Sequence, residues 1–318
     1  MNLAVNKSLQ PMNSQSQRFR SRMQAVARCW QLYLLILPAV VAVFVFNYIP
    51  MYGIQIAFKD FRSSLGIWNS EWVGFKHFAR FITFPDFWKV IRNTLGISLY
   101  SISTFPCAVI LALMINEINS KVFKKTVQMI SYAPHFISVV VICSMVRLFL
   151  SRDHGLINNL IVLVGLDRQD FITLPHYFST IYVWSGVWQG IGWGTIIYLA
   201  ALSNVSPELI EAARIDGANR FQVLLHVNFP FILPTVVTLL ILSTGSVLSV
   251  GFEKIFLLQN PLNMAASRVI STYVYEMGIG GGQFSYSSAI GLFNNIINIA
   301  IIAFVNQVSK RVTQVSLW

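Results

Sequence analysis

Charged side chains are scarce in this sequence. Asp, Glu, Lys and Arg make up 11% of the 318 residues and hydrophobic residues 55%, whereas about 25% of an ordinary soluble domain is charged. The apolar residues gather in runs close to the ~20 residues that a helix needs to cross a membrane. Because lipid offers no hydrogen-bond partners, runs without period-2 alternation favour helices. We therefore predict an all-α integral membrane protein with six core transmembrane helices, at 29–48, 94–115, 128–150, 177–202, 231–250 and 285–305.

Residues that perform catalysis or bind metal are also few. Cys29, Cys107 and Cys143 lie in apolar runs and form no CxxC pair, and the five histidines are scattered. A GxxxxGK[ST] phosphate-binding loop is absent, as are HExxH and GxSxG, so the usual means of holding ATP and the usual catalytic sets are missing. We expect no catalytic residue, no metal site and no cofactor bound by this chain.

The first 28 residues are basic and contain no acidic residue. Such a tail is typically solvated, and no small-residue cleavage site follows it, so we expect an uncleaved first helix with its basic flank in the cytoplasm. Six spans then place both termini inside, although only twelve of the 23 Lys and Arg fall on that side. The net charge of +11 is spread along the chain, which argues against nucleic-acid binding. The expected organisation is a cytoplasmic tail at 1–28, a first span with an extracytoplasmic interfacial segment at 29–93, a core domain at 94–306 and a cytoplasmic tail at 307–318.

Two glycine-containing segments carry specific expectations. Gly186, Gly190 and Gly194 recur at four-residue intervals in the fourth span and share one helix face. They favour close packing of another helix, with a channel wall that leaves room for solute as the alternative. Residues 278–283 are expected to form a loop, because four glycines in five positions are costly in a helix.

The segment between the fourth and fifth spans, residues 206–230, is polar and compact. Ser206 is a good N-cap, Pro207 suits the first helical position, and Glu208 faces the positive end of the helix dipole. A first helix is expected to run to about Asp216. Gly217 can then adopt the positive φ that ends a helix.

A second helix is expected over residues 219–229, with Pro230 and Pro234 marking entry into the fifth span. Residues at helical spacing on it predict a stripe that packs on the membrane body. These residues are Phe221, Leu224, Leu225 and Asn228. The remaining surface is left for water or a partner, and carries Glu211, Arg214, Asp216 and Arg220. From the residues alone, this helix-turn-helix hairpin is either a well-capped solvated loop or a docking element.

The hairpin also carries a specific resemblance. Residues 211–218 read Glu-Ala-Ala-Arg-Ile-Asp-Gly-Ala, with Phe221, Pro230 and Pro234 following. This pattern resembles the EAA motif of binding-protein-dependent ABC importer permeases, with Phe229 where Leu usually precedes the first proline. Other segments resemble the carbohydrate-uptake branch, which handles oligosaccharides and polysaccharide fragments and includes importers of acidic polysaccharides such as alginate. They lie at 48–53, 93–95, 132–138, 192–202, 251–254 and 285–287.

The resemblance implies a type I importer permease fold and a division of labour among subunits. In this family the EAA hairpin includes a coupling helix that sits in a groove on a separate ATPase subunit, where ATP and Mg are expected. Glu211 is the expected polar anchor and Gly217 the turn that lets the hairpin fit. The other ATPase-coupling candidates are Ala212, Ala213, Arg214, Asp216 and Ala218.

The resemblance also implies an assembly in the bacterial inner membrane. It contains a second permease chain, which is expected to differ from this one, so that the two permeases form a heterodimer rather than a homodimer. Two ATP-binding subunits and an extracytoplasmic solute-binding protein complete it. The expected substrate is a saccharide, and no partner apart from these subunits and membrane lipid is implied.

Candidate residues for the solute path are uncharged. No charged residue lies near the centre of an expected span, which argues against a carrier driven through buried acids. A saccharide needs hydrogen-bonding groups and aromatic faces, which Trp188, Gln189, Trp193, Asn294 and Asn298 offer, with interhelical packing as the alternative.

Two alternatives to the importer prediction stay open. A secondary carrier or channel would need no ATPase, and buried carboxylates or an inverted repeat would favour it. A membrane-embedded enzyme would need a clustered catalytic set. Glu253 and Lys254, beyond the fifth span, are explained equally well by a structural ion pair and by contact with a delivering protein.

Overall fold

The computed structural model describes residues 30–245, 247, 248, 250–312 and 316. The chain divides between Gln55 and Ile56 into two compact units. Unit 1 contains α2 (Trp30–Val43), the π-helical turn η1 (Phe44–Tyr48) and the start of the 3₁₀ segment η2 (Ile49–Phe58). The predicted basic tail at 1–28 lies outside the described residues, and the predicted C-terminal tail begins as the last turns of α17.

Unit 2 opens with an irregular segment and two long helices. The strands β1 (Lys59–Asp60) and β2 (Glu71–Trp72) form an antiparallel pair. The buried His77 lies against this pair with Nε2 3.2 Å from the Lys59 carbonyl oxygen, and burial lowers the pKa of its ring. The helices of this part are α3 (Gly66–Asn69), α4 (Lys76–Ile82), α5 (Phe87–Ser103) and α6 (Pro106–Asn116).

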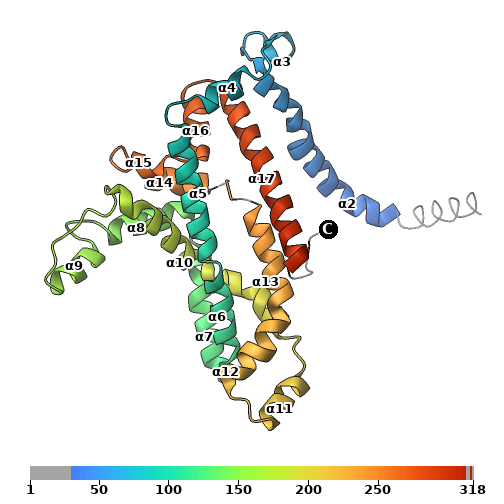
Figure 1. Ribbon diagram of the computed structural model, residues 1–318, viewed down its shortest axis with the longest axis vertical. Helices are drawn as coiled ribbons and strands as arrows, with labels where there is room; N and C mark the ends of the chain where they lie inside the picture. Colours follow the sequence, from blue (N-terminus) through green and yellow to red (C-terminus); the bar gives the residue numbers. More distant parts are fainter. Residues whose placement is uncertain (1–29, 246, 249, 313–315, 317–318) are drawn as a thin grey trace, which may run out of the picture. The chain divides into compact units, whose positions relative to one another are not determined.

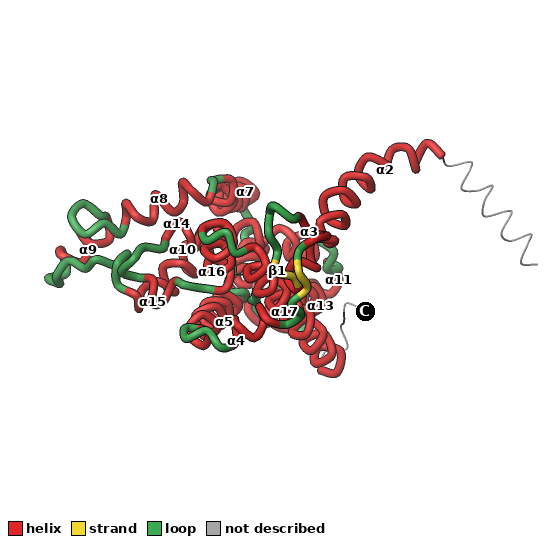
Figure 2. Tube along the Cα trace, turned by 90° about the horizontal axis from the view of Figure 1, so that it is seen from above, coloured by secondary structure: helices red, strands yellow, loops and turns green. Residues whose placement is uncertain are grey.

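The remaining elements of unit 2 are almost all helical (Figures 1 and 2). Those before the fourth predicted span are α7 (Lys121–Tyr132), η3 (Ala133–Phe136), α8 (Val139–Phe149) and α9 (Leu156–Leu163). Those that follow are α10 (Pro175–Leu202), α11 (Pro207–Ile215), α12 (Arg220–Val223), η4 (Leu224–Asn228), α13 (Phe229–Thr244), α14 (Phe252–Leu258), α15 (Met264–Ser267), α16 (Ile270–Tyr275), η5 (Glu276–Gly280) and α17 (Phe284–Val312).

Four helical stretches are long and apolar enough to cross a membrane, or five if one bent pair counts as a span. The four are Trp30–Phe58, Phe87–Asn116, Arg220–Thr244 and Phe284–Arg311. The predicted fourth span is the 28-residue α10, which is about 42 Å long at 1.5 Å per residue but too polar to join this set. The all-α membrane fold is confirmed, and the count of six spans stays a prediction.

The predicted span at 128–150 is wrong as a single helix. Residues Lys121–Phe136 and Val139–Phe149 form two pieces that meet at an angle of 102°. Pro134 lies in the 3₁₀ turn η3, and Ile137 has an extended backbone. Ser138 then starts α8 anew, because its side chain accepts a hydrogen bond from the Val141 N–H at 3.4 Å. A serine side chain that caps a new helix in this way competes with continuation of the preceding helix. Apolar composition alone did not predict the bend.

Three apolar clusters form the core of unit 2, and α10 contributes to two of them. One joins α5, α8, α10 and α14 around Ile97 and Ile142. Another joins α4, α5, α16 and α17 around Phe81 and Tyr286. The third joins α6, α10 and α13 around Ala112 and reaches the end that carries α11 and α12. In Figure 1 these two helices lie at the opposite end of unit 2 from α4 and α16.

The predicted loop at 278–283 is partly wrong. Residues Glu276–Gly280 continue α16 as the π-helical turn η5, and only then does Gly282 turn the chain with φ of 65°. Packing explains the helical glycine, because a Cβ on Gly278 would lie 2.6 Å from the Ser287 hydroxyl oxygen of α17. Contact between η5 and α17 therefore outweighs the low helix propensity of glycine.

The closest helix approach in α10 occurs at Gly192. A Cβ there would lie 2.0 Å from the Ser131 carbonyl oxygen of α7, whereas a Cβ on Gly190 would meet nothing within 4 Å. We expect Gly192→Ala to lower the stability of the subunit by about 1–3 kcal/mol or more through overpacking, and Gly190→Ala to leave it near wild type. Thermal unfolding of the two variants in detergent checks this, and equal melting temperatures would contradict the close contact.

Candidate functional site

The hairpin at 206–230 has the caps that the sequence predicts. The Ser206 side chain accepts a hydrogen bond from the Glu208 N–H at 3.3 Å. At the other end of α11, Gly217 has φ of 85°. Its N–H donates to the Arg214 carbonyl at 3.1 Å, and the Ala218 N–H donates to the Ala213 carbonyl at 2.9 Å. This pair of bonds is the Schellman motif, so the EAA segment ends in a fixed left-handed turn.

A reciprocal cap starts the second helix of the hairpin. The Gln222 N–H donates to Asn219 Oδ1 at 2.9 Å, and the Asn219 N–H donates to Gln222 Oε1 at 2.8 Å. The predicted end at Phe229 is wrong, because the helix runs without a break from Arg220 to Thr244. Pro230 lies in the first turn of α13, directly after the π-helical turn η4. The hairpin is therefore rigidly continuous with the fifth predicted span.

The predicted packing stripe is wrong for two of its residues. Phe221 is 66% exposed and Leu225 is also exposed. Instead, Val223 is buried and Leu224 and Val227 pack against the third cluster. The π-helical turn over residues 224–228 adds a residue and rotates the face that follows it relative to the 3.6-residue spacing.

The EAA residues gather at an exposed tip. Glu211, Ala212, Arg214 and Asp216 are exposed, whereas Ala213 and Ala218 are half-buried. Apolar side chains share this tip, with Ile215 86% exposed. Among the described residues no ion pair involves the carboxylate of Glu211. An exposed carboxylate beside an apolar side chain on a capped turn is suited to binding a partner surface.

Asn228 links the hairpin to the end of α6 by a hydrogen bond. It is only 2% exposed, and its Nδ2 donates to Glu117 Oε1 at the end of α6 over 3.3 Å. Its Oδ1 is buried without a hydrogen-bond partner among the described residues. Sequence spacing placed Asn228 on an otherwise apolar stripe. A polar residue at such a position could have predicted the buried hydrogen bond.

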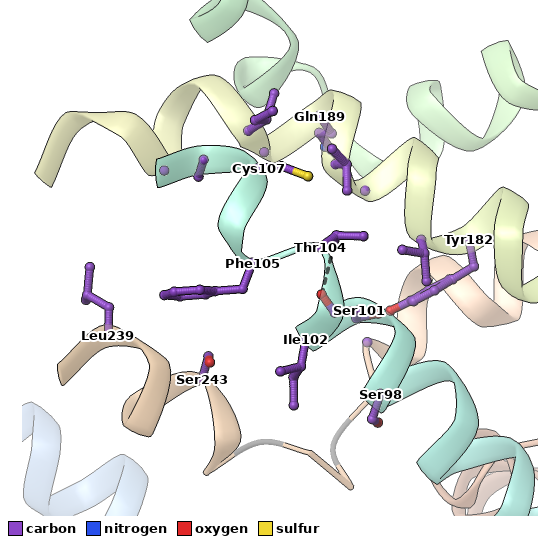
Figure 3. A pocket seen from close by; sticks show the side chains of 18 of the residues that line it. Ser98, Ser101, Ile102, Thr104, Phe105, Cys107, Tyr182, Gln189, Leu239 and Ser243 are labelled. Carbon is purple, nitrogen blue, oxygen red and sulfur yellow. Dashed lines mark hydrogen bonds between the residues drawn. The ribbon is translucent and has the colours of Figure 1, made fainter. Parts of the chain in front are cut away.

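A cavity of about 660 Å³ lies between α5, α6, α10, α13 and α14 (Figure 3). Its volume falls within the ~300–1,000 Å³ of ordinary ligand sites. Hydroxyl and aromatic groups line it, as a saccharide path requires. The lining includes Ser98, Ser101, Thr104, Phe105, Tyr182, Tyr198 and Ser243.

One charged side chain, Lys254 of α14, reaches this cavity. Its Nζ donates to the Tyr182 carbonyl at 3.0 Å and lies 5.1 Å from the centre of the Tyr182 ring. The proposed ion pair with Glu253 is not present among the described residues. The ammonium therefore has a backbone acceptor and an aromatic ring beside it, but no carboxylate among the described residues. In the sequence, the position of Lys254 just beyond the fifth predicted span was the only indication of a functional role for this residue.

The five predicted solute-path residues do not lie together. Only Gln189 is among the residues that line this cavity, and its Nε2 donates to the Ile137 carbonyl at the bend of α7 and α8. Trp193 stacks on His135 outside it, with ring centres 4.4 Å apart. Asn298 accepts a hydrogen bond from the Leu248 N–H at 3.0 Å, and Asn294 Oδ1 is buried without a partner among the described residues. The role of Trp188, which is exposed, stays a prediction.

The glycine row of α10 forms a wall of the cavity. Gly186, Gly190 and Gly194 all line it. Close helix packing is also present at the row, because a Cβ on Gly194 would lie 3.1 Å from the Ala108 Cβ of α6, and at the neighbouring Gly192. The predicted packing therefore holds at Gly194, and a role of the row as a channel wall stays a prediction. Spacing alone placed the three glycines on one face, but it did not show that this face meets α6 and Lys254 of α14.

Fold, hairpin and cavity together define a membrane subunit of a transport system. Residues 104–314 match the family of binding-protein-dependent transport system inner membrane components. The chain belongs to this family, as the EAA motif predicted. It is therefore an inner-membrane component of such a system.

Two relatives from Bacillus subtilis (strain 168) are similar over nearly the whole chain. Protein LplB is 42% identical over 299 residues, which cover 94% of each chain. The polygalacturonan/rhamnogalacturonan transport system permease protein YteP is 42% identical over 281 residues, which cover 88% of each.

Solved structures show the same fold. A chain of a bacterial ABC transporter involved in the import of the acidic polysaccharide alginate is 40% identical, with a TM-score of 0.84 over 92% of this chain and 99% of that one. A second match, 39% identical with a TM-score of 0.84, is the bacterial alginate ABC transporter in complex with alginate pentasaccharide-bound periplasmic protein. The predicted importer permease fold is confirmed by this similarity.

Proposed function

We propose that this chain is the permease subunit of an ATP-driven importer of acidic oligosaccharides. The observation that carries the substrate class is Lys254, an ammonium without a carboxylate partner among the described residues, on the wall of the central cavity. A carboxylated sugar would supply the missing anion. The similarity to the alginate importer chain and to YteP supports the same class.

The assembly we propose contains a second, different permease chain, two ATP-binding subunits and an extracytoplasmic solute-binding protein. ATP and Mg belong to the ATP-binding subunits. Both termini lie in the cytoplasm, so that the hairpin faces the ATPases and the opposite end of unit 2 faces the binding protein. The complex of the alginate transporter with its periplasmic protein supports the last of these partners.

The hairpin transmits force because it is stiff at both ends. The Schellman turn at Gly217 fixes its tip, and the unbroken helix from Arg220 to Thr244 carries its motion into the wall of the cavity. Closure of the ATPases would draw two coupling hairpins together and open the cavity outward. Such a change requires contacts that differ between the two states, and Asn228 with Glu117 is positioned to supply one.

Stimulation of ATPase activity tests the substrate class. We expect the complete complex with its binding protein to hydrolyse ATP several-fold faster with an oligouronate than without, and a neutral oligosaccharide of equal length to have no such effect. Equal stimulation by the neutral oligosaccharide would contradict an acidic substrate while leaving the importer function intact.

A further inference from the structure

A second groove lies in unit 2, away from the hairpin. It has a volume of about 640 Å³ and lies between the first turns of α5 and α10 and the short helix α15. In Figure 1, α15 and the start of α5 lie in the half of unit 2 opposite to α11. We call it the tryptophan groove, after Trp88 on its rim. No candidate residue for coupling or for the solute path lines it.

Asparagine side chains hold the walls of the tryptophan groove together. Asn93 of α5 donates to the carbonyls of Ala265 and Arg268, both at 3.0 Å. Asn263, which precedes α15, donates to the Ile172 carbonyl ahead of α10 at 3.0 Å. Each wall is therefore tied to α15 by amide hydrogen bonds. The groove is preformed, so a ligand would not have to order it.

Two unpaired cations and an indole ring line this groove, and the indole of Trp88 has the Phe87 ring at its edge, with ring centres 5.2 Å apart. Lys89 and Arg92 are exposed, and neither forms an ion pair or a hydrogen bond among the described residues. The nearby Asp86 is 3.8 Å from Arg268 instead. Trp88 is 76% exposed. Two unpaired cations beside an exposed tryptophan are suited to binding an anionic ligand that also has an apolar part.

The tryptophan groove is separate from the central cavity. At 100° per residue, Lys89 and Arg92 lie within about 60° of each other around α5, whereas Ser98 and Ser101 of the cavity wall lie on the opposite side. A ligand in the groove therefore approaches from the outside of α5 rather than along the solute path. This arrangement disfavours a passing saccharide and favours a component of the surrounding membrane.

We propose that the tryptophan groove binds the headgroup of an anionic phospholipid. Tryptophan is enriched at the level of lipid headgroups, and Lys or Arg side chains near a membrane surface attract anionic lipids. Lys89 and Arg92 contact the phosphate, and Trp88 packs on the glycerol and upper acyl region. Because α15 joins α5 and α10 here, the bound lipid stabilises the end of the spans that faces away from the hairpin.

Lipid binding to the complete purified complex tests this site. Phosphatidylglycerol and phosphatidylethanolamine are titrated separately and their binding is followed by native mass spectrometry. We expect Lys89→Gln combined with Arg92→Gln to weaken phosphatidylglycerol binding about 25-fold, taking about fivefold for each cation near the membrane surface. Phosphatidylethanolamine binding should not change. Trp88→Leu is expected to weaken both lipids by a smaller factor.

Arg152→Gln is the matched control, because Arg152 is an exposed arginine outside this groove. It should bind phosphatidylglycerol as the wild type does. Unchanged phosphatidylglycerol binding in the double variant would overturn the proposal. Displacement of the lipid by a soluble oligouronate would also overturn it by assigning the groove to saccharide. Cross-linking of the Trp88→Cys variant to the second permease chain would overturn it by assigning the groove to subunit contact. None of these measurements depends on which saccharide is transported.

Discussion

Glu211→Ala is expected to abolish most saccharide uptake while the subunit still inserts into the membrane. The carboxylate is exposed at the tip of the hairpin and forms no ion pair among the described residues, so its removal leaves the fold intact. A hydrogen bond to a charged group contributes about 1.5–3 kcal/mol, which corresponds to roughly 10- to 100-fold weaker docking of the ATPase. Uptake into proteoliposomes and co-purification of the ATPase subunit measure the two effects.

Glu208→Ala serves as the control, since Glu208 lies on the same helix one turn earlier and is also exposed. We expect uptake close to wild type from it. Gly217 gives an independent check, because its φ of 85° suits glycine or asparagine. Gly217→Pro should remove uptake, since proline fixes φ near −65° and lacks the N–H that binds the Arg214 carbonyl. Gly217→Asn should retain it. Wild-type uptake in both Glu211→Ala and Gly217→Pro would remove the hairpin from the mechanism.

Lys254→Met is expected to lower uptake of an acidic oligosaccharide by about 10-fold or more, taking about 1.5–3 kcal/mol for the lost charged hydrogen bond. Methionine keeps much of the side-chain length and removes the charge. The substitution removes the hydrogen bond to the Tyr182 carbonyl and the contact with its ring, but it also relieves the burial of a charge without a carboxylate, so the net change in stability is expected to be small. A large loss of uptake without a matching fall in melting temperature separates a transport role from a structural one.

Lys125→Met is the control for this substitution, because Lys125 is exposed on α7 and lies outside the cavity. It should leave uptake unchanged. The measurement compares uptake of an oligouronate by the two variants at equal amounts of reconstituted complex. An oligouronate uptake rate that Lys254→Met does not alter would exclude Lys254 as a substrate contact.

Local chemistry made parts of the fold predictable from the sequence. Ser206 and Gly217 were placed correctly as caps, since a hydroxyl at an N-cap and glycine at a left-handed turn act within one helical turn. The EAA motif identified the family for the same reason, because its residues are contiguous. The apolar runs likewise placed most of the long helices.

Features that depend on tertiary contacts were not predictable in this way. The helical Gly278 reflects its close contact with Ser287 of α17, and residues of the π-helical turn before Phe229 pack against the third cluster. The bend at Ile137 starts locally, at Pro134 and the Ser138 cap, but it brings the Ile137 carbonyl to Gln189, and sequence spacing gives no distance between residues so far apart.

Lys254 shows the same limit at the level of the site. Its sequence position allowed an ion pair with Glu253, and only the packing of α14 against α10 turns its Nζ toward the Tyr182 carbonyl. The predicted path residues were chosen by chemical type within spans, and only one of them, Gln189, lies on the cavity wall.

Uptake by reconstituted proteoliposomes tests most directly whether this chain moves solute by receiving force from an ATPase. The vesicles contain both permease chains and the binding protein, with or without the ATP-binding subunits, and a labelled oligouronate is supplied. We predict ATP-dependent accumulation only when the ATP-binding subunits are present, and its loss in Glu211→Ala. Accumulation without those subunits would contradict the importer mechanism and favour a secondary carrier.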